Sequence, residues 1–291
     1  MIEKIIENLS KHKNIIDNID EILNDKNPRN EKVLCEYTSK INKNNQHSLK
    51  YETNMYFPLI YELKSNCPTC GYRSIESKRQ YNSKYIEHAI KYEIDQIKQY
   101  NICSINCYNK DENKYKESDV IFKTLDLYNI DKNIKIYDVN DFSLLRKHEF
   151  KKIIINQKEK EVYETATKQP TKIENKEIIL ELNIDDKNIL DDIENLGNLK
   201  EKNIHSIQLR GYDPFIDVIE EYHPQYTREY LLKIICIMKI LYPEIELKIQ
   251  HAANNNNFYE ESIKLGISTI TGVYTNKNSS TFNLNEIIIE K

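Results

Sequence analysis

Hydrophobic positions recur along this chain with two spacings, one typical of helices and one typical of strands. Isoleucines and leucines recur every three to four residues over 2–23, and a second helix is expected over 31–41. Pro28 separates the two segments, since proline does not continue a helix. We expect residues 1–48 to form a helical extension that covers one end of the fold.

From residue 49 onward, strand-like segments alternate with helix-like segments. The predicted strands cover 101–105, 133–139, 152–156, 160–163, 177–184, 204–209, 245–250 and 267–272. The predicted helices cover 83–100, 119–128, 141–150, 186–199, 227–242 and 257–265. This alternation predicts an α/β fold over 49–291, a (β/α)8 or partial TIM-type barrel, which typically needs about 250 residues.

Composition narrows the classes of partner. The chain has 291 residues, a formal net charge of −4 and a pI near 6.1, so no basic excess points to a nucleic acid. The first residues are charged throughout and lack a signal-peptide core. No apolar run approaches the ~20 residues that a membrane-spanning helix needs. We expect a soluble cytoplasmic protein with a small-molecule substrate and no membrane or nucleic-acid partner.

Cysteines supply the clearest candidate chemistry. Cys67 and Cys70 form a C-x-x-C in a polar loop that follows an apolar, β-prone run, and Cys103 and Cys107 follow at the next predicted strand. Cysteines in a chain without a secretion signal are better explained by metal ligation or burial than by disulfides. Two metal sites fit the residues: a zinc ion held by all four thiolates, or a 4Fe–4S cluster held by Cys67, Cys70 and one further residue.

Several segments, in order over about residues 50–275, resemble the radical S-adenosylmethionine (SAM) enzymes of the biotin-synthase-like group. The segments are FPLIYELKSNCPTCGYR at 57–73, YETATK at 163–168, GYDPFI at 211–216, REYLLKIICIMKILYPEIELKI at 228–249 and SIKLGISTITG at 262–272. The C-G-Y-R ending is most similar to the radical SAM protein of mono-iron hydrogenase cofactor biosynthesis in methanogens. That resemblance implies a role in building the iron-guanylylpyridinol cofactor.

The cluster motif departs from the family pattern. The family's first cysteine would stand at Leu63, or at Tyr61 in the hydrogenase subfamily, and neither position is a cysteine. The third thiolate would then come from Cys103 or Cys107, or the cluster is lost and the barrel is a degenerate relative. In the second case a four-cysteine zinc site would serve a binding or scaffold protein.

The resemblance also implies roles for other residues. It implies a 4Fe–4S cluster and SAM as cofactors and a reductant protein such as ferredoxin or flavodoxin as a partner. The residues that it implies for SAM binding are Arg73, Glu164 and Thr165, the last two at the end of the predicted strand 160–163. The residues that it implies for substrate binding are Arg210, Asp213 and His251, which follow later predicted strands.

Overall fold

A computed structural model gives the arrangement of most of the chain. It describes residues 2–43, 49–57, 91, 94–95, 103–109, 122–128, 130–184, 189–210, 228–250 and 256–272. The predicted helix 83–100 and the segments that contain Cys67, Cys70, Arg73, Asp213 and His251 fall largely or wholly outside these residues.

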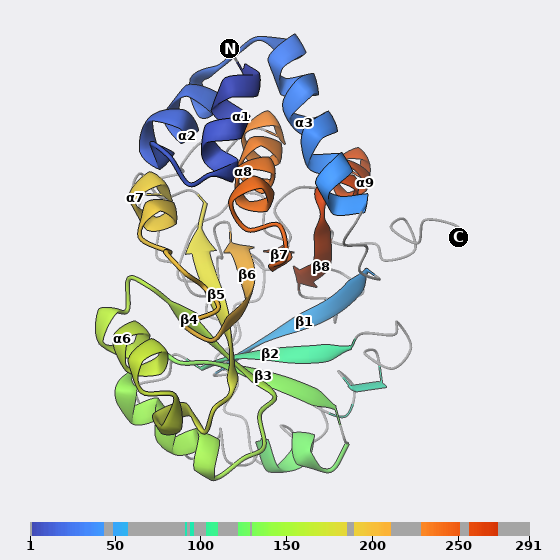
Figure 1. The fold of residues 1–291 in the computed structure, drawn as a ribbon. Helices are drawn as coiled ribbons and strands as arrows, with labels where there is room; N and C mark the ends of the chain where they lie inside the picture. The colour runs from blue at the N-terminus through green and yellow to red at the C-terminus, as the bar shows by residue number, and fades with distance from the viewer. Residues whose placement is uncertain are drawn as a thin grey trace, which may run out of the picture.

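Eight parallel strands close into a barrel in chain order, and β1 completes the circle by pairing with β8 (Figure 1). Closure leaves no sheet edge unpaired. The strands are β1 (Lys50–Phe57), β2 (Ser104–Asn109), β3 (Asp131–Lys135), β4 (Lys152–Asn156), β5 (Glu177–Asn183), β6 (Ile204–Arg210), β7 (Glu246–Gln250) and β8 (Ile267–Gly272). The predicted TIM-type barrel is therefore confirmed.

Helices separate the strands and also precede them. The described α-helices are α1 (Ile2–Ser10), α2 (Ile15–Asn24), α3 (Pro28–Lys43), α6 (Lys160–Lys168), α7 (Ile189–Glu194), α8 (Arg228–Leu241) and α9 (Asn256–Leu265). The described residues also form the 3-10 helices η2 (Val139–Arg146) and η3 (Pro170–Ile173), in the β3–β4 and α6–β5 connections.

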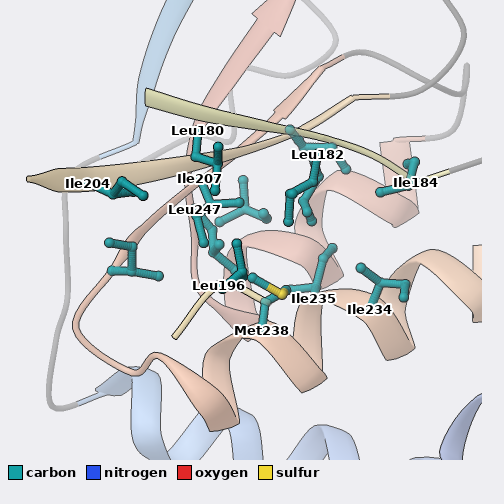
Figure 2. Close-up of a cluster of buried hydrophobic side chains, with 14 of the residues drawn as sticks. Leu180, Leu182, Ile184, Leu196, Ile204, Ile207, Ile234, Ile235, Met238 and Leu247 are labelled. Carbon is teal, nitrogen blue, oxygen red and sulfur yellow. The ribbon is translucent and has the colours of Figure 1, made fainter. Parts of the chain in front are cut away.

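The strands carry apolar side chains outward and polar side chains inward. Leu180 and Leu182 of β5, and Ile184 directly after it, are buried in the layer between the barrel and α8, which contributes Ile235 and Met238 (Figure 2). The residues between them, Glu181 and Asn183, belong to the opposite face, because side chains alternate along a strand. The interior of this barrel is therefore polar over a large part of its wall.

Helix α8 is buried on all sides. Every residue from Leu231 to Leu241 is buried, including Lys233 and Lys239. The barrel covers one side of this helix and α1, α2 and α3 cover another (Figure 1). An all-round apolar helix is the pattern expected for such a position.

The N-terminal helices lie on the flank of the barrel. They contact α7, α8 and α9 (Figure 1), and Lys233 of α8 donates hydrogen bonds to the carbonyls of Leu23 and Asp25 at the end of α2. The predicted helical extension therefore packs against the helices that surround the barrel. The apolar face of α8 decides its position, since this is the surface that would otherwise be exposed.

Two predicted strands were misplaced. Residues 160–163 begin helix α6, in which Val162 and Ala166 are buried about one helical turn apart. The predicted strand 101–105 was too early, because β2 starts at Ser104. Its inward residues, Ser104 and Asn106, are polar and buried, so hydrophobicity alone did not mark the strand.

Within the described residues, no helix combines the length and the apolar character that crossing a membrane requires.

Candidate functional site

Charged side chains gather where β3, β4, β5 and β6 end. In barrels of parallel strands, the residues that bind and react stand at the carboxyl ends of the strands. Here Lys135 ends β3, Glu159 stands in the turn between β4 and α6, Glu181 lies near the end of β5 and Arg210 ends β6. We call these four residues the carboxyl-end cluster.

The members of the carboxyl-end cluster neutralise one another. Lys135 Nζ lies 3.2 Å from Glu159 Oε2 and 3.3 Å from Glu181 Oε1. Arg210 Nη1 lies 3.6 Å from the same oxygen of Glu181. The side chain of Glu181 is only 1% exposed, so its charge depends on these two cations rather than on water.

The two carboxylates of the cluster have pKa values that move in opposite directions. Burial raises the pKa of Glu159, and this effect outweighs the attraction of Lys135. Burial also acts to raise the pKa of Glu181, but Lys135 and Arg210 together outweigh it and lower that pKa. Glu181 is therefore the fixed anion of the cluster, and Glu159 is the carboxyl group that accepts a proton more readily.

A tight turn after β4 directs Glu159 back toward the barrel. The backbone N–H of Glu159 donates to the carbonyl of Asn156 at 3.1 Å, and the N–H of Asn156 donates to Glu159 Oε2 at 3.4 Å. Asn156 Oδ1 also accepts the N–H of Lys158 at 2.9 Å, which closes the turn. The carboxylate is therefore positioned by backbone groups on the strand that precedes it.

A second charged pair lies within the barrel wall. Lys248 of β7 donates to Glu52 Oε1 of β1 at 2.7 Å, and both side chains are almost fully buried. Because only β8 separates β7 from β1 in the barrel, this pair passes along the inner wall over β8.

The structure does not bring Cys103 and Cys107 to the carboxyl ends of the strands. Cys103 precedes β2, and its N–H donates to the carbonyl of Tyr51 at 2.9 Å near the start of β1. Cys107 is buried in the outer apolar layer, and this burial raises its thiol pKa to about 12. Burial is also the main cause that raises the pKa of Cys103.

The structure does not bring Cys103 and Cys107 together as two ligands of one zinc ion. Four residues of extended strand place Cys103 and Cys107 about 13 Å apart, whereas zinc–sulfur bonds are about 2.3 Å long. Neither thiol lies at the carboxyl ends of the strands, because Cys103 precedes β2 and Cys107 lies in the outer apolar layer. Within the described residues, no three His, Cys, Asp or Glu side chains converge as metal ligands.

Glu164 and Thr165 are not at a strand end. Both lie in α6, where Glu164 is partly exposed and pairs with Lys168 at 3.3 Å along the helix. The carbonyl of Thr165 accepts the N–H of Gln169 at the end of the same helix. The predicted strand end that motivated these two residues is absent, so we leave them out of the site.

Arg210 is the predicted site residue that the structure does place at the carboxyl end of a strand, while Asp213 and His251 lie outside the described residues. Sequence reasoning missed Lys135, Glu159 and Glu181. A signal was present for two of them, because Lys135 and Glu181 are charged residues inside otherwise apolar strand patterns, NIKI and ILEL. A buried charge in such a pattern indicates a polar interior.

Comparisons with known proteins support the fold. No protein-family model matches the chain, and no curated protein is similar to it in sequence. The solved structure of HydG, a maturase of the [FeFe]-hydrogenase, is similar with a TM-score of 0.65 at 16% identity, over 96% of this chain and 71% of that one. HydG from Carboxydothermus hydrogenoformans matches with a TM-score of 0.65 at 15% identity, over 93% and 70% of the two chains.

A third solved structure, methylornithine synthase (PylB), has a TM-score of 0.64 at 10% identity and covers 98% of this chain and 90% of that one. The shared arrangement therefore extends over nearly the whole chain. At these identities the likeness is one of fold.

Proposed function

We propose that the chain is a radical SAM enzyme that holds a 4Fe–4S cluster and SAM at the carboxyl ends of its barrel strands. The observation that carries the proposal is the complete parallel barrel with a buried charged cluster at those ends, joined to a C-x-x-C-G-Y-R segment that follows β1 in the chain. The sequence resemblance and the likeness of fold to a hydrogenase maturase and to methylornithine synthase support the same function.

The carboxyl-end cluster suits an amino acid group that carries both charges. Lys135 and Arg210 offer cations to a carboxylate, and Glu159 and Glu181 offer anions to an ammonium group. The two charges of such a ligand can replace the pairs within the cluster, so that each buried charge still has a counter-charge. An unpaired buried charge would be costly. SAM has an amino acid group of this kind, and Arg73 remains a proposed further contact.

Cys67 and Cys70 are the proposed thiolate ligands of the iron cluster, and the third ligand is a residue other than Cys103 and Cys107. When bound with SAM, such a cluster supplies one-electron cleavage of SAM to methionine and a 5′-deoxyadenosyl radical. The protein positions the substrate carbon and excludes water. Asp213 and His251 remain proposed substrate contacts, and a ferredoxin or flavodoxin is the proposed electron donor.

Within this class we propose a role in biosynthesis of the iron-guanylylpyridinol cofactor of mono-iron hydrogenase. The C-G-Y-R ending of the cysteine segment supports this choice. The likeness of fold to a maturase of a different hydrogenase is compatible with it.

Anaerobic purification and reconstitution test the proposal. We expect iron and sulfide bound at about four atoms each per chain, a brown protein, and production of 5′-deoxyadenosine from SAM under reducing conditions. Cys67→Ser and Cys70→Ser should abolish iron binding and SAM cleavage. Cys103→Ser is the matched control and should retain both. A colourless protein that binds no iron after reconstitution would contradict the proposal.

A further inference from the structure

Three neighbouring strands present asparagines to one another inside the barrel. Asn54 of β1 is the cross-strand partner of Asn106 of β2, and Asn106 is the partner of Asn133 of β3. These three residues are at most 3% exposed. We call them the asparagine ladder. Parallel strands in exact register bring side chains of one face within contact of each other, so the ladder is a direct result of the pairing.

The hydrogen bonds of the asparagine ladder have one direction. Asn133 Nδ2 donates to Asn106 Oδ1 at 2.8 Å. Asn106 Nδ2 in turn donates to Glu52 Oε2 and to Asn54 Oδ1, both at 3.1 Å. This series of hydrogen bonds ends at the carboxylate of Glu52, whose other oxygen accepts a hydrogen bond from Lys248 at 2.7 Å.

Glu52 fixes this direction. An ionised carboxylate only accepts hydrogen bonds, so Asn106 must turn its amide nitrogen toward Glu52. Its oxygen then faces Asn133, which must offer its own nitrogen. The carbonyl oxygen of Asn133, Oδ1, is therefore the acceptor left over at the end of this series of hydrogen bonds. Reversing the amide of Asn106 would place its oxygen against Glu52 Oε2, and reversing that of Asn133 would place its oxygen against Asn106 Oδ1, so either change would bring two acceptors together.

Asn133 Oδ1 is buried and has no hydrogen-bond partner among the described residues. Asn133 itself is 2% exposed. Ser206 is a fully buried residue on the inner face of β6, and its hydroxyl also has no hydrogen-bond partner among the described residues. A buried polar atom without a partner is costly, so two of them on opposite walls of one barrel indicate a ligand that supplies hydrogen bonds.

The charges around the ladder select the kind of ligand. Glu52 is paired with Lys248, and the four members of the carboxyl-end cluster are paired among themselves. A ligand group with a single charge would leave one charge in this buried region without a counter-charge. A neutral group that donates a hydrogen bond satisfies Asn133 Oδ1 without that penalty.

We propose that Asn133 is a substrate-specificity residue, whose fixed carbonyl oxygen accepts a hydrogen bond from a neutral hydroxyl or amide group of the substrate, opposite Ser206. The inference deepens the proposed function and rests on it for calling the ligand a substrate. It assigns the substrate class as a small neutral molecule with hydrogen-bond donors, bound deeper in the barrel than the carboxyl-end cluster.

A titration with matched probes tests the inference on the reconstituted full-length protein. The probes are 3-hydroxypyridine, which is neutral and donates a hydrogen bond, 3-methoxypyridine, which cannot donate, and pyridine-3-carboxylate, which is an anion. Binding is followed by ligand-observed NMR without reductant. We expect 3-hydroxypyridine to bind at least tenfold more tightly than the other two.

Substitutions at Asn133 test whether the asparagine ladder is the source of the selectivity between the probes. Asn133→Leu should bring the ratio between 3-hydroxypyridine and 3-methoxypyridine close to one, while the exposed control Asn24→Leu should leave it unchanged. Asn133→Asp places an anion at the same point and should increase the affinity for the cation 3-(aminomethyl)pyridine several-fold. This gain separates a binding role from a loss of folding.

The inference would be overturned if the hydroxyl and methoxy probes bound equally, or if 3-hydroxypyridine showed no saturable binding. It would also be overturned if the selectivity persisted in Asn133→Leu. Iron content and SAM cleavage are measured on the same samples. Protein that discriminates between the probes but holds no iron would refute the proposed function alone. Protein that holds iron and cleaves SAM without discriminating would refute only the inference about Asn133.

Discussion

The pair formed by Lys248 and Glu52 shows how a single residue can control the interior of this barrel. Both side chains are almost fully buried, and Glu52 also anchors Asn106. Lys248→Met should leave the Glu52 carboxylate buried without a cation and reduce the free energy of unfolding by about 3 to 5 kcal/mol. Urea denaturation measures this change.

A second variant separates the charge from the shape. The double variant Glu52→Gln/Lys248→Met removes both charges, so it should recover most of the stability that the single variant loses, because replacing both partners of a buried pair is often close to neutral. A double variant as unstable as Lys248→Met would contradict this account of the pair.

Lys239 makes stability depend on pH. It is 1% exposed in α8, donates to the carbonyls of Ile245 and Pro243 at 2.8 and 3.3 Å, and burial lowers its pKa from 10.5 to about 8. Below about pH 8 the lysine is charged in both states, so the folded state carries the full cost of a buried charge. Between about pH 8 and 10.5 the unfolded state binds more protons, so this contribution to stability rises with pH.

We therefore expect the wild type to gain stability relative to Lys239→Met between pH 7 and pH 10, by on the order of 2 to 3 kcal/mol. Urea unfolding at several pH values measures the difference. Lys4→Met, on the exposed side of α1, is the control and should show no such trend. A constant difference between wild type and Lys239→Met would refute the role of the buried charge.

At the scale of elements, the junction between α9 and β8 depends on a glycine. Gly266 has φ +111°, and a Cβ there would lie 2.5 Å from Lys239 Cε and 3.0 Å from Asn42 Oδ1. Gly266→Ala should lower the free energy of unfolding by about 2 kcal/mol or more, because both the backbone conformation and the space exclude a side chain. Thermal unfolding measures the loss.

Gly197→Ala provides the comparison for this prediction. Gly197 also has a positive φ, +58°, but a Cβ there would meet only Lys202 Nζ at an ordinary 3.6 Å. We expect a smaller loss, since the left-handed conformation alone costs about 1 kcal/mol. Equal losses in the two variants would show that close packing at Gly266 has no effect.

At the scale of the whole molecule, the N-terminal helices and the barrel form one packed unit. Ile19 of α2 is fully buried, and the extension covers α8, whose residues 231–241 are all buried. Ile19→Ala should therefore lower the unfolding temperature of the entire molecule in one transition, with a loss of about 2 to 5 kcal/mol. Calorimetry checks this. Two separate transitions, with only the first one shifted, would show that the extension folds independently.

The sequence alone determined the class of fold, because the outward face of the barrel follows simple hydrophobic patterns. Leu180 and Leu182 of β5 alternate with the polar residues Glu181 and Asn183, and α8 is an almost continuous apolar run. Such patterns follow from local periodicity and the burial of apolar surface, which residue types reveal directly. The same reasoning placed Arg210 at a strand end.

Only the tertiary structure decided which polar residues contact one another inside the barrel. The link of Lys248 to Glu52 spans 196 positions in the chain, and the asparagine ladder joins residues 27 and 52 positions apart. Spacing along the chain carries no information about such contacts, because strand order, register and barrel closure create them. The same factors place Cys103 before β2 and Cys107 in the outer apolar layer, whereas the predicted strand 101–105 had placed both near a strand end.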